Sequence, residues 1–507
     1  MLLSALLSQV DVIDIHADLS LDVPRIVSDS RRAGEGCMFL CLRGVRTDGH
    51  RFIAEAKARG AALAVLEDPS YIPPDLPYVL VKNTRAAAAG IWNNYYGDPT
   101  KDMRVIAITG TNGKTSTSYI LRAILSAAGY KTGLIGTVRC LCGEEEIDIG
   151  GGGEIADVPS AMTTPDPEYL YGAAAVMCQR GADVLILEAT SHALDLSKAD
   201  ALHIDMGIFT NLSPEHLDYH GTMERYLRAK SRLFTLCPVG IVLADDPWAE
   251  RLIGENPGCR FIRCSASGTG TADVRALRQE MQGIDGVSYV YYSKQTVFRV
   301  KCPVPGKFTV ANTMLAITAA HQLGIDPLTI QEALRSFCGV EGRMERVILP
   351  GAPFSLFLDY AHTPAALESL LRTVRHARQN GERITLLFGC GGDRDPTKRP
   401  VMGRIASALA DFVILTGDNC RTENPDVILT QIRRGMDREK PHIVIPDRRE
   451  AIRYAIREAG AGDILLFAGK GHEKYEIDGE GKHPFDEAEI ARTAYRDRSG
   501  DKRTPHS

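Results

Sequence analysis

Five short apolar runs recur in the last third of the chain, and stretches with helical spacing separate them. The runs cover residues 354–359, 383–389, 411–417, 442–446 and 463–469. Continuous apolar runs of this length are typical of strands in a parallel sheet that helices cover on both faces. The alternation of strand and helix therefore predicts such a sheet here, with functional loops after the carboxyl ends of its strands.

The middle of the chain predicts a second parallel sheet. Apolar runs cover residues 103–109 and 182–189, and a helix is expected from Lys114 to Ala128. With 507 residues, the chain has room for about three domains. Its character changes at the polar stretch 93–102 and again at 338–347. We therefore expect an α/β protein with a small N-terminal α/β domain (1–98), a central P-loop parallel-sheet domain (99–339) and a C-terminal Rossmann-like domain (340–507).

Local patterns complete this outline. In the first domain, residues 37–42 predict a strand and the alanine-rich stretch 52–66 predicts a helix. The first ten residues predict an amphipathic helix and not a signal peptide, because Asp11 and Asp14 soon interrupt them. The glycine run Gly150–Gly153 predicts a loop.

Composition narrows the class of protein. The formal net charge of −5 lacks the basic excess of a chain that grips nucleic acid. The 12 cysteines form neither a disulfide framework nor paired zinc spacing, so we expect thiols in a reducing compartment. No run approaches the ~20 apolar residues of a membrane span. We expect a cytoplasmic protein without membrane insertion.

The strongest local motif is GTNGKTS, residues 110–116, between a predicted strand and a predicted helix. Backbone N–H groups of such a loop, together with the helix N-terminus, bind phosphate oxygens. Lys114 is expected to reach the outer phosphates of ATP, and the Thr115 hydroxyl to bind Mg²⁺. The full pattern has a glycine where this chain has Ile108, and the bland alternative is a glycine-rich turn between strand and helix.

A second cluster extends from Glu188, at the end of a predicted strand, to Lys230. Its polar loop contains Asn211, His216 and His220. Glu188 and His216 are suitable ligands for a cation that also binds phosphate oxygens. Taken alone they are ordinary loop or core residues, and the P-loop in the same predicted sheet favours the metal interpretation.

Four further clusters follow predicted strands of the last domain: DYAHTP (359–364), GCGGDRDPTKRP (389–400), DNCR (418–421) and GKGHE (469–473). The second contains Arg394, Lys398 and Arg399. Arginine is suited to bidentate recognition of carboxylates. Each cluster alone could be a solvated loop, but their common position at strand ends predicts a binding face for a zwitterionic or anionic substrate.

Six segments, in chain order, resemble the Mur ligases of peptidoglycan synthesis: GTNGKTS (110–116), NLSPEHLDYHGTMERYLRAK (211–230), GRMERV (342–347), DYAHTPAALE (359–368), GCGGDRD (389–395) and GKGHE (469–473). The likeness is strongest to the members that add the third residue of the stem peptide. It covers essentially the whole chain, and SDSRRAGEGCMFLCLRG resembles the family's UDP-binding domain. The resemblance implies an ATP- and Mg²⁺-dependent ligase that joins an amino acid to UDP-MurNAc-L-Ala-D-Glu through an acyl phosphate, acting as a monomer.

The resemblance also implies roles for the matching positions. ATP would contact Gly110, Thr111, Asn112, Gly113, Lys114, Thr115, Ser116, Asn312, Arg343, Asp359 and His362. Mg²⁺ would be held by Thr115, Glu188, His216 and Lys230, the last as a carbamate (N6-carboxylysine). The catalytic residues would be Lys114, Lys230, Glu188 and His216. The UDP-peptide would contact Ser30, Thr163, Thr164, Thr190 and Lys198. The amino acid would contact Arg394, Asp418, Asn419, Cys420, Arg421, Gly469 and Glu473.

Two segments depart from the family pattern. Leu196 and Lys198 stand where a glutamine and an arginine are usual, and Cys420 stands where diaminopimelate enzymes have proline. Arg421 is retained, and its guanidinium suits the second carboxylate of meso-diaminopimelate, which lysine lacks. The open alternatives are the same reaction with L-lysine and a folylpolyglutamate synthase-like ligase. Outside this class, a P-loop switch or motor and a catalytically inactive nucleotide-binding regulator fit the motifs less well.

Overall fold

The computed structural model describes residues 1–44, 47–147, 162–379 and 381–499. The chain divides into two compact units, Met1–Arg275 with Met314–Asp326, and Ala276–Thr313 with Pro327–Ser507. The division runs through strand β14 (Val274–Met281) and helix α10 (Lys307–Gln322). The domain boundaries expected after residues 98 and 339 stay predictions. The predicted loop Gly150–Gly153 lies outside the described residues.

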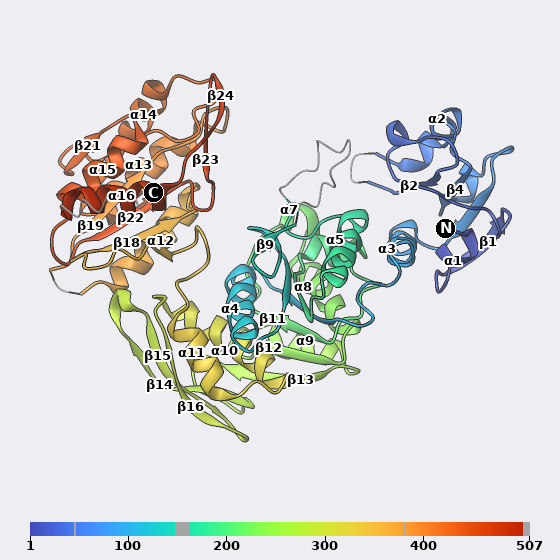
Figure 1. Ribbon diagram of the computed structural model, residues 1–507, viewed down its shortest axis with the longest axis horizontal. Helices are drawn as coiled ribbons and strands as arrows, with labels where there is room; N and C mark the ends of the chain where they lie inside the picture. Colours follow the sequence, from blue (N-terminus) through green and yellow to red (C-terminus); the bar gives the residue numbers. More distant parts are fainter. Residues whose placement is uncertain (45–46, 148–161, 380, 500–507) are drawn as a thin grey trace, which may run out of the picture. The chain divides into compact units, whose positions relative to one another are not determined.

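A five-stranded sheet forms the first part of unit 1, in the order β1-β5-β4-β3-β2 (blue in Figure 1). Alternate residues of its inner strands enter two cores: Met38 and Leu40 pack on one face, Phe39 on the other. Its strands are β1 (Val12–His16), β2 (Ile26–Val27), β3 (Met38–Leu40), β4 (Leu63–Leu66) and β5 (Tyr78–Val81). The α-helices are α1 (Leu3–Leu6), α2 (Ile53–Ala58) and α3 (Thr84–Tyr95), and the 3-10 helices are η1 (Ser30–Arg32), η2 (Gly49–Phe52) and η3 (Pro69–Tyr71).

The helix predicted over residues 52–66 is wrong in its second half. Helix α2 ends at Ala58, and strand β4 begins at Leu63. Gly60 separates them with a φ of +104°, and a side chain there would meet the backbone of Glu35 at 2.9 Å. Only glycine adopts this conformation easily, and the apolar LAVL that follows fills a buried strand position.

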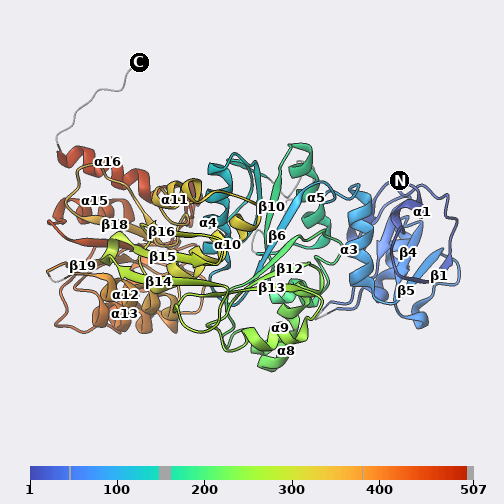
Figure 2. The same cartoon turned by 90° about the horizontal axis from the view of Figure 1, so that it is seen from below.

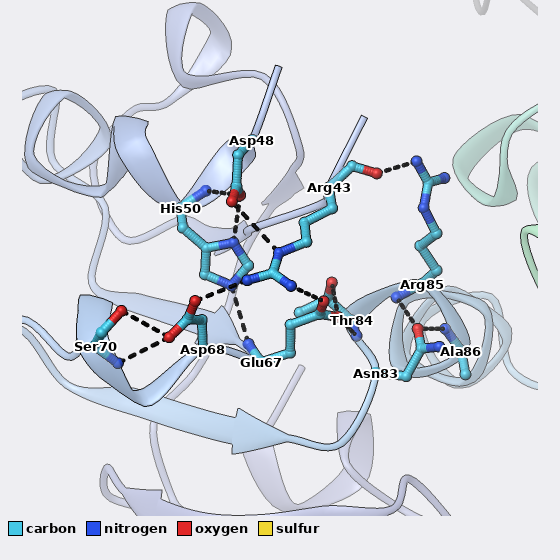
Figure 3. A network of polar contacts seen from close by, with 10 residues as sticks. All are labelled: Arg43, Asp48, His50, Glu67, Asp68, Ser70, Asn83, Thr84, Arg85 and Ala86. Carbon is cyan, nitrogen blue, oxygen red and sulfur yellow. Dashed lines mark hydrogen bonds and ion pairs between the residues drawn. The ribbon is translucent and has the colours of Figure 1, made fainter. Parts of the chain in front are cut away.

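A polar network joins the ends of these elements (Figure 3). The Arg43 guanidinium lies 2.7 Å from Asp68, 3.4 Å from Asp48 and 3.5 Å from Glu67. Buried His50 donates from Nδ1 to Asp48 at 2.6 Å and accepts at Nε2 from the Glu67 N–H at 3.1 Å. One cation and one imidazole therefore hold three carboxylates together and connect the segments that follow β3 and β4.

The central sheet of unit 1 is parallel from β13 to β7, in the order β13-β12-β11-β6-β10-β7, and β8 and β9 continue it antiparallel. Figure 1 shows α4 on one side of these strands and α5, α8 and α9 on the other, and Leu185 and Leu187 enter the core built with α5, α8 and α9. The strands are β6 (Arg104–Thr109), β7 (Thr132–Ile135), β8 (Cys140–Cys142), β9 (Glu145–Glu146), β10 (Val184–Glu188), β11 (Met206–Phe209), β12 (Val239–Leu243) and β13 (Arg260–Ser265). The helices are α4 (Lys114–Ala127), α5 (Pro167–Gln179), α6 (Ser191–Asp195), α7 (Leu217–His220), α8 (Met223–Ser231), η4 (Arg232–Thr235) and α9 (Ala249–Glu255).

Unit 2 contains the predicted last sheet, in the order β17-β18-β22-β19-β20-β21, parallel from β18 to β21. Its strands are β17 (Glu345–Arg346), β18 (Ser355–Asp359), β19 (Ile384–Phe388), β20 (Phe412–Leu415), β21 (His442–Val444) and β22 (Ile464–Ala468). Unit 2 also contains two hairpins. The hairpin of β15 (Val287–Ser293) and β16 (Val297–Cys302) continues the central sheet after β14, and the hairpin of β23 (Tyr475–Asp478) and β24 (Gly481–Pro484) is a separate two-stranded sheet. The helices are η5 (Gly283–Asp285), α11 (Pro327–Arg335), α12 (Pro364–Ala377), α13 (Lys398–Leu409), α14 (Pro425–Arg433), α15 (Arg448–Glu458) and α16 (Glu487–Ser499).

Both faces of this sheet are covered, which explains why its inner strands are mostly apolar on both faces. Leu386 and Leu466 enter the core built with α12, α13 and α14, and their neighbours Leu387 and Leu465 enter the core built with α15 and α16. Figure 2 shows α15 and α16 on one side of the strands and α12 and α13 on the other. Since strand residues alternate between faces, both sets of positions must be apolar.

The N-terminal helix is shorter than its sequence suggested, since α1 covers only Leu3–Leu6. Across the part of the chain that the structure describes, no helix has both the length and the apolar character needed to cross a membrane.

Candidate active site

The predicted phosphate loop lies between β6 and α4, in the context that its motif requires. Gly110 and Gly113 have φ values of +147° and +86°, and Lys114 is the first residue of the helix. A side chain at position 110 would come within 1.8 Å of the Thr210 hydroxyl. The glycines therefore let the loop turn tightly against β11 and direct N–H groups of the α4 N-terminus outward, where they favour an anion.

Residues from the end of β11 brace this loop, which the motif alone did not indicate. Asn211 accepts from the N–H of Thr111 at 2.8 Å through its carbonyl and from that of Asn112 at 3.0 Å through Oδ1. The Thr210 hydroxyl donates to the Asn112 carbonyl at 2.6 Å. Because β11 is the parallel neighbour of β6, its C-terminal residues lie beside the loop. The sequence contained a sign of this contact, because the polar residues Thr210 and Asn211 directly follow the apolar run of β11.

Lys114 folds back over the loop. Its Nζ donates to the carbonyl oxygens of Gly110 and Thr111, both at 2.9 Å. Its ammonium thus lies at the mouth of the loop, where the predicted phosphate contact requires it.

Glu188 is a fully buried carboxylate among hydroxyls. It accepts from Thr115 at 2.9 Å, from Thr137 at 2.8 Å and from Ser118 at 3.2 Å. Among the described residues it forms no salt bridge. Burying a carboxylate without a cation costs free energy of folding, and carboxylate and hydroxyl oxygens are ligands of hard cations. The oxygens around Glu188 therefore fit a bound metal ion. Thr137 and Ser118 are contacts that the sequence analysis missed.

Lys230 is also buried, with 1% of its surface exposed. Its Nζ donates to the Gly110 carbonyl at 2.8 Å and lies 4.6 Å from the centre of the Tyr226 ring. Burial, reinforced by the nearby Lys114 ammonium, holds the pKa of Lys230 well below its ordinary value. A lowered pKa favours the neutral amine, the form of lysine that reacts with CO₂, so the environment of Lys230 fits the predicted carbamate.

His216 lies in the exposed loop before α7 with a left-handed φ of +54°. Its ring is 6.3 Å from Tyr226 and 5.0 Å from His192. Across the described ranges, no three His, Cys, Asp or Glu side chains form a ready metal site. The predicted set contains only two such residues, Glu188 and His216, and depends on Thr115 and modified Lys230 for the others.

The predicted peptide-binding threonines surround Glu188. Thr164 donates to the Glu188 carbonyl at 2.7 Å and lies 3.2 Å from the Thr190 hydroxyl. The Thr163 hydroxyl is 3.0 Å from that of Thr137. The structure therefore brings these threonines to the predicted metal carboxylate.

Two other predicted peptide contacts have partners within the protein. Lys198 is 6% exposed and pairs with Asp166 at 2.8 Å. Ser30 begins η1 and donates to Glu55 at 3.0 Å. Lys198 therefore carries a charge that Asp166 already partly balances.

The remaining ATP-contact candidates lie in unit 2. Asp359, at the end of β18, accepts from the N–H groups of Met344 at 2.8 Å and Ala361 at 2.9 Å. Burial raises the pKa of Asp359, while these N–H groups and Arg343 oppose the rise. His362 is exposed and donates to the Tyr360 carbonyl at 2.8 Å, and Asn312 is buried in α10.

The four loop clusters follow β18, β19, β20 and β22, which are adjacent strands of one parallel sheet. The carboxyl ends of parallel strands meet at one edge, so the four clusters lie together there, as predicted, while the role of this edge in binding stays a prediction. Asn419 contacts Glu473 at 2.8 Å, and a side chain at Gly469 would lie 2.8 Å from Asp418. Asp418, Asn419, Gly469 and Glu473 are thereby gathered in one place.

Arg421 joins the loops after β19 and β20. Its Nη1 donates to the Gly392 carbonyl at 2.8 Å and to that of Asn419 at 3.3 Å, and its φ is +51°. Cys420 is half-buried beside it. Arg394 lies exposed on the loop after β19. A non-glycine residue with positive φ is uncommon and is held only by surrounding contacts, as at many binding loops.

The sequence analysis grouped Arg399 with the substrate-facing arginines, and the structure corrects this. Arg399 is 0% exposed, contacts Glu423 through two nitrogens at 2.9 Å and donates to the Gly391 carbonyl at 3.1 Å. Arg399 therefore connects the loops after β19 and β20 inside the protein, because it makes polar contacts with Gly391 and Glu423.

Three models of known protein families match successive stretches of the chain. The Mur ligase middle domain matches residues 108–320, the Mur ligase glutamate ligase domain matches 342–471, and the Mur ligase family catalytic domain matches 23–96. The chain belongs to the Mur ligase family.

Individual relatives match this Mur ligase over nearly its full length. A protein of Clostridioides difficile (strain 630) named UDP-N-acetylmuramoyl-L-alanyl-D-glutamate–2,6-diaminopimelate ligase is 38% identical over 493 residues, 97% of this chain and 99% of that one. A protein of the same name from Synechococcus elongatus is 39% identical, covering 95% and 96%. A solved structure with that name has a TM-score of 0.72 and 30% identity, covering 98% and 99%. The predicted family, α/β fold class and ligase class are confirmed, and the individual site residues stay predictions.

Proposed function

We propose that this Mur ligase joins meso-2,6-diaminopimelate to the γ-carboxylate of D-Glu in UDP-MurNAc-L-Ala-D-Glu, using ATP. The proposal rests on two groups of residues that this reaction needs. One is a phosphate loop beside a buried carboxylate, and the other is a strand-end cluster with Arg421 and Glu473. The names of the relatives support diaminopimelate as the added amino acid over L-lysine. We further propose that the protein acts in the cytoplasm as a monomer.

The reaction must activate a carboxylate, since its oxygen is a poor leaving group. The γ-phosphoryl group of ATP moves to the D-Glu γ-carboxylate oxygen, which gives an acyl phosphate and ADP. The amine of diaminopimelate then attacks the acyl carbon, loses a proton, and phosphate leaves from the tetrahedral intermediate. Lys114, at the mouth of the phosphate loop, stabilises the charge of the transferred group.

Glu188 and Thr115 are proposed to hold Mg²⁺ together with His216 and carbamylated Lys230. When bound, the ion would neutralise phosphate charge. Thr115 and Glu188 are 2.9 Å apart, and Thr163, Thr164 and Thr190 lie around them. In this proposal the threonines orient the peptide carboxylate toward the γ-phosphate.

The amino acid is proposed to lie against the strand-end loops of unit 2. Glu473 and Asp418 would receive its ammonium groups, and the Arg421 guanidinium and Arg394 its carboxylates. Lysine lacks the distal carboxylate, so Arg421 is the proposed basis of the choice between them.

The decisive experiment is an ADP-release assay with UDP-MurNAc-L-Ala-D-Glu and ATP. It offers meso-diaminopimelate, L-lysine and L-ornithine separately. We expect release only with diaminopimelate. Equal activity with L-lysine, or none with any amino acid, contradicts the proposal.

The carbamate has its own test. Lys230→Ala should lose activity, and a short carboxylic acid should restore part of it, because the acid can occupy the position of the carbamate oxygens. Full activity of Lys230→Ala without any acid contradicts the role. Mass spectrometry cannot report a labile carbamate well, so ¹³C NMR of the protein under ¹³CO₂ is the independent readout.

A further inference from the structure

The GKGHE segment after β22 contains a buried lysine to which the proposed function gives no role. Lys470 is 0% exposed, although lysine is almost never fully buried without partners. Its Nζ donates to the Asn419 side-chain oxygen and to the Tyr475 carbonyl, both at 2.9 Å, and lies 3.7 Å from Asp418. All three acceptors belong to the protein, so the ammonium is directed inward.

These contacts determine which way the Asn419 amide faces. Its oxygen accepts from Lys470 Nζ and from the Ile477 N–H, both at 2.9 Å. Since a lysine ammonium only donates, the amide oxygen must face it. The amide nitrogen therefore points the other way and donates to Glu473 at 2.8 Å. Through one amide, the lysine sets the position of the Glu473 carboxylate.

The same lysine restrains Asp418. Gly469, just before Lys470, has a φ of +115°, and a side chain there would meet Asp418 at 2.8 Å. The close approach of this backbone lets Lys470 enter beneath Asp418. Arg448 adds a second positive charge, and its Nη1 donates to the Gly417 carbonyl at 3.1 Å.

We infer that Lys470 is a positioning residue of the amino-acid site, which acts through Asn419 to place Glu473 and through its charge to place Asp418. This inference rests on the proposed function, because those three residues are its amino-acid contacts. Lys470 itself touches no substrate. Its loss should weaken amino-acid binding and leave the ATP and UDP-peptide sites unchanged.

The test compares Lys470→Met with wild type in the ADP-release assay, with each of the three substrates varied in turn. Methionine keeps the apolar stem and removes the ammonium. We expect the KM for diaminopimelate to rise about 10-fold or more, as for other supporting groups behind a binding residue. The KM values for ATP and UDP-peptide should change less than about twofold.

Lys474→Met is the matched control. Lys474 directly follows the same segment, with 59% of its side chain exposed, and it forms salt bridges with Glu341 and Asp486. It should behave as wild type. Lys470→Gln, which is neutral but keeps an N–H donor, carries the same test if the methionine variant does not fold.

The outcomes separate the two proposals. A wild-type enzyme without diaminopimelate-dependent ADP release overturns the proposed function. An active wild type whose Lys470 variants keep the amino-acid KM, or whose three KM values rise together, overturns the positioning role alone. A selective rise in the amino-acid KM, smaller in Lys470→Gln than in Lys470→Met, supports it.

Discussion

Two buried carboxylates, one in each unit, are treated in opposite ways. Glu188 is surrounded by the hydroxyls of Thr115, Thr137 and Ser118. Asp418 lies 3.7 Å from the Lys470 ammonium, and Arg448 is a second nearby cation. Among the described residues Glu188 has hydroxyl donors but no salt bridge, as the proposed Mg²⁺ site requires, whereas Asp418 has cations of the protein beside it.

This difference separates two ways to build a site. A site completed by its ligands carries uncompensated charge when empty, which lowers stability in favour of function. A site with internal ion pairs holds its binding groups in place beforehand, at a desolvation cost that only complete pairing offsets. Removing the charge of Glu188 should therefore not lower the stability of the protein, whereas removing a cation beside Asp418 should lower it.

The largest effect is expected for Lys114→Ala, which removes the cation at the phosphate loop. ADP release should fall about 10³-fold or more, because preorganised charge at the transferred group is lost. The unfolding midpoint should stay near that of wild type, since Lys114 is half-exposed. Exposed Lys101→Ala is the control. Retained activity contradicts the phosphate role.

Arg448→Met should cause the largest loss of stability. Arg448 and Glu487 form a pair at 2.8 Å with 0% and 1% of their side chains exposed. Removing one partner leaves a buried carboxylate, at a cost of about 3 kcal/mol in unfolding free energy. Denaturant titration measures it, with exposed Arg449→Met as the adjacent control. An equal effect of both variants would contradict internal pairing.

Glu188→Gln should separate activity from stability. The amide keeps the shape and can still meet the three hydroxyls, but it is a poor metal ligand, so ADP release should fall about 10²-fold. Without nucleotide or Mg²⁺, the variant should unfold at the same or a higher temperature than wild type, because a buried unpaired charge has been removed. Calorimetry without ligands measures this. A less stable variant would falsify the comparison.

Arg421→Ala should change substrate choice more than stability. Loss of a hydrogen-bonded carboxylate partner should raise the KM for diaminopimelate about 10- to 100-fold. The KM for ATP should not change. A competition assay with diaminopimelate and L-lysine measures the selectivity of the variant. If Arg421→Ala weakens the use of L-lysine and not that of diaminopimelate, the proposed contact is ruled out.

The smallest effect concerns acid stability. Although burial alone would raise it, Arg448 and Lys470 hold the pKa of Asp418 below its ordinary value. Because the folded-state pKa is depressed, the stabilisation is complete above the unfolded pKa and is lost as the pH falls through the folded one. The stability difference between wild type and Asp418→Asn should be constant from pH 5 to 8 and shrink below about pH 4. A difference that grows on acidification contradicts the pairing.

Much of the fold could be predicted from the sequence wherever a local pattern was compatible with only one kind of secondary structure. The strands β6, β10, β18, β19, β20 and β22 lie within the predicted runs, because long apolar runs beside helical stretches suit only a covered parallel sheet. Residues 52–66 failed because alanine and leucine fit helix and buried strand alike. There, the φ of Gly60 decided where the helix ended.

The candidate site was partly readable for a similar reason. Lys114 and Thr115 follow from the loop motif, since phosphate binding constrains adjacent residues. Thr137, Asn211 and Lys470 contact their partners across 51, 99 and 51 positions of the chain. A local pattern can mark such a polar residue, as after β11, but it does not name the partner, because strand order and not sequence distance brings the two together.

By itself, the sequence determined the class of fold, the phosphate loop and the four strand-end clusters, because each depends on residues that are near one another along the chain. Only the tertiary structure decided which charges are balanced. It buried Glu188 among hydroxyls, turned Arg399 and Lys470 inward, and left Arg394 exposed. Residue type gives a charge, but the partners that neutralise it come from other strands and loops, and their distances decide whether the group binds a ligand or supports the site.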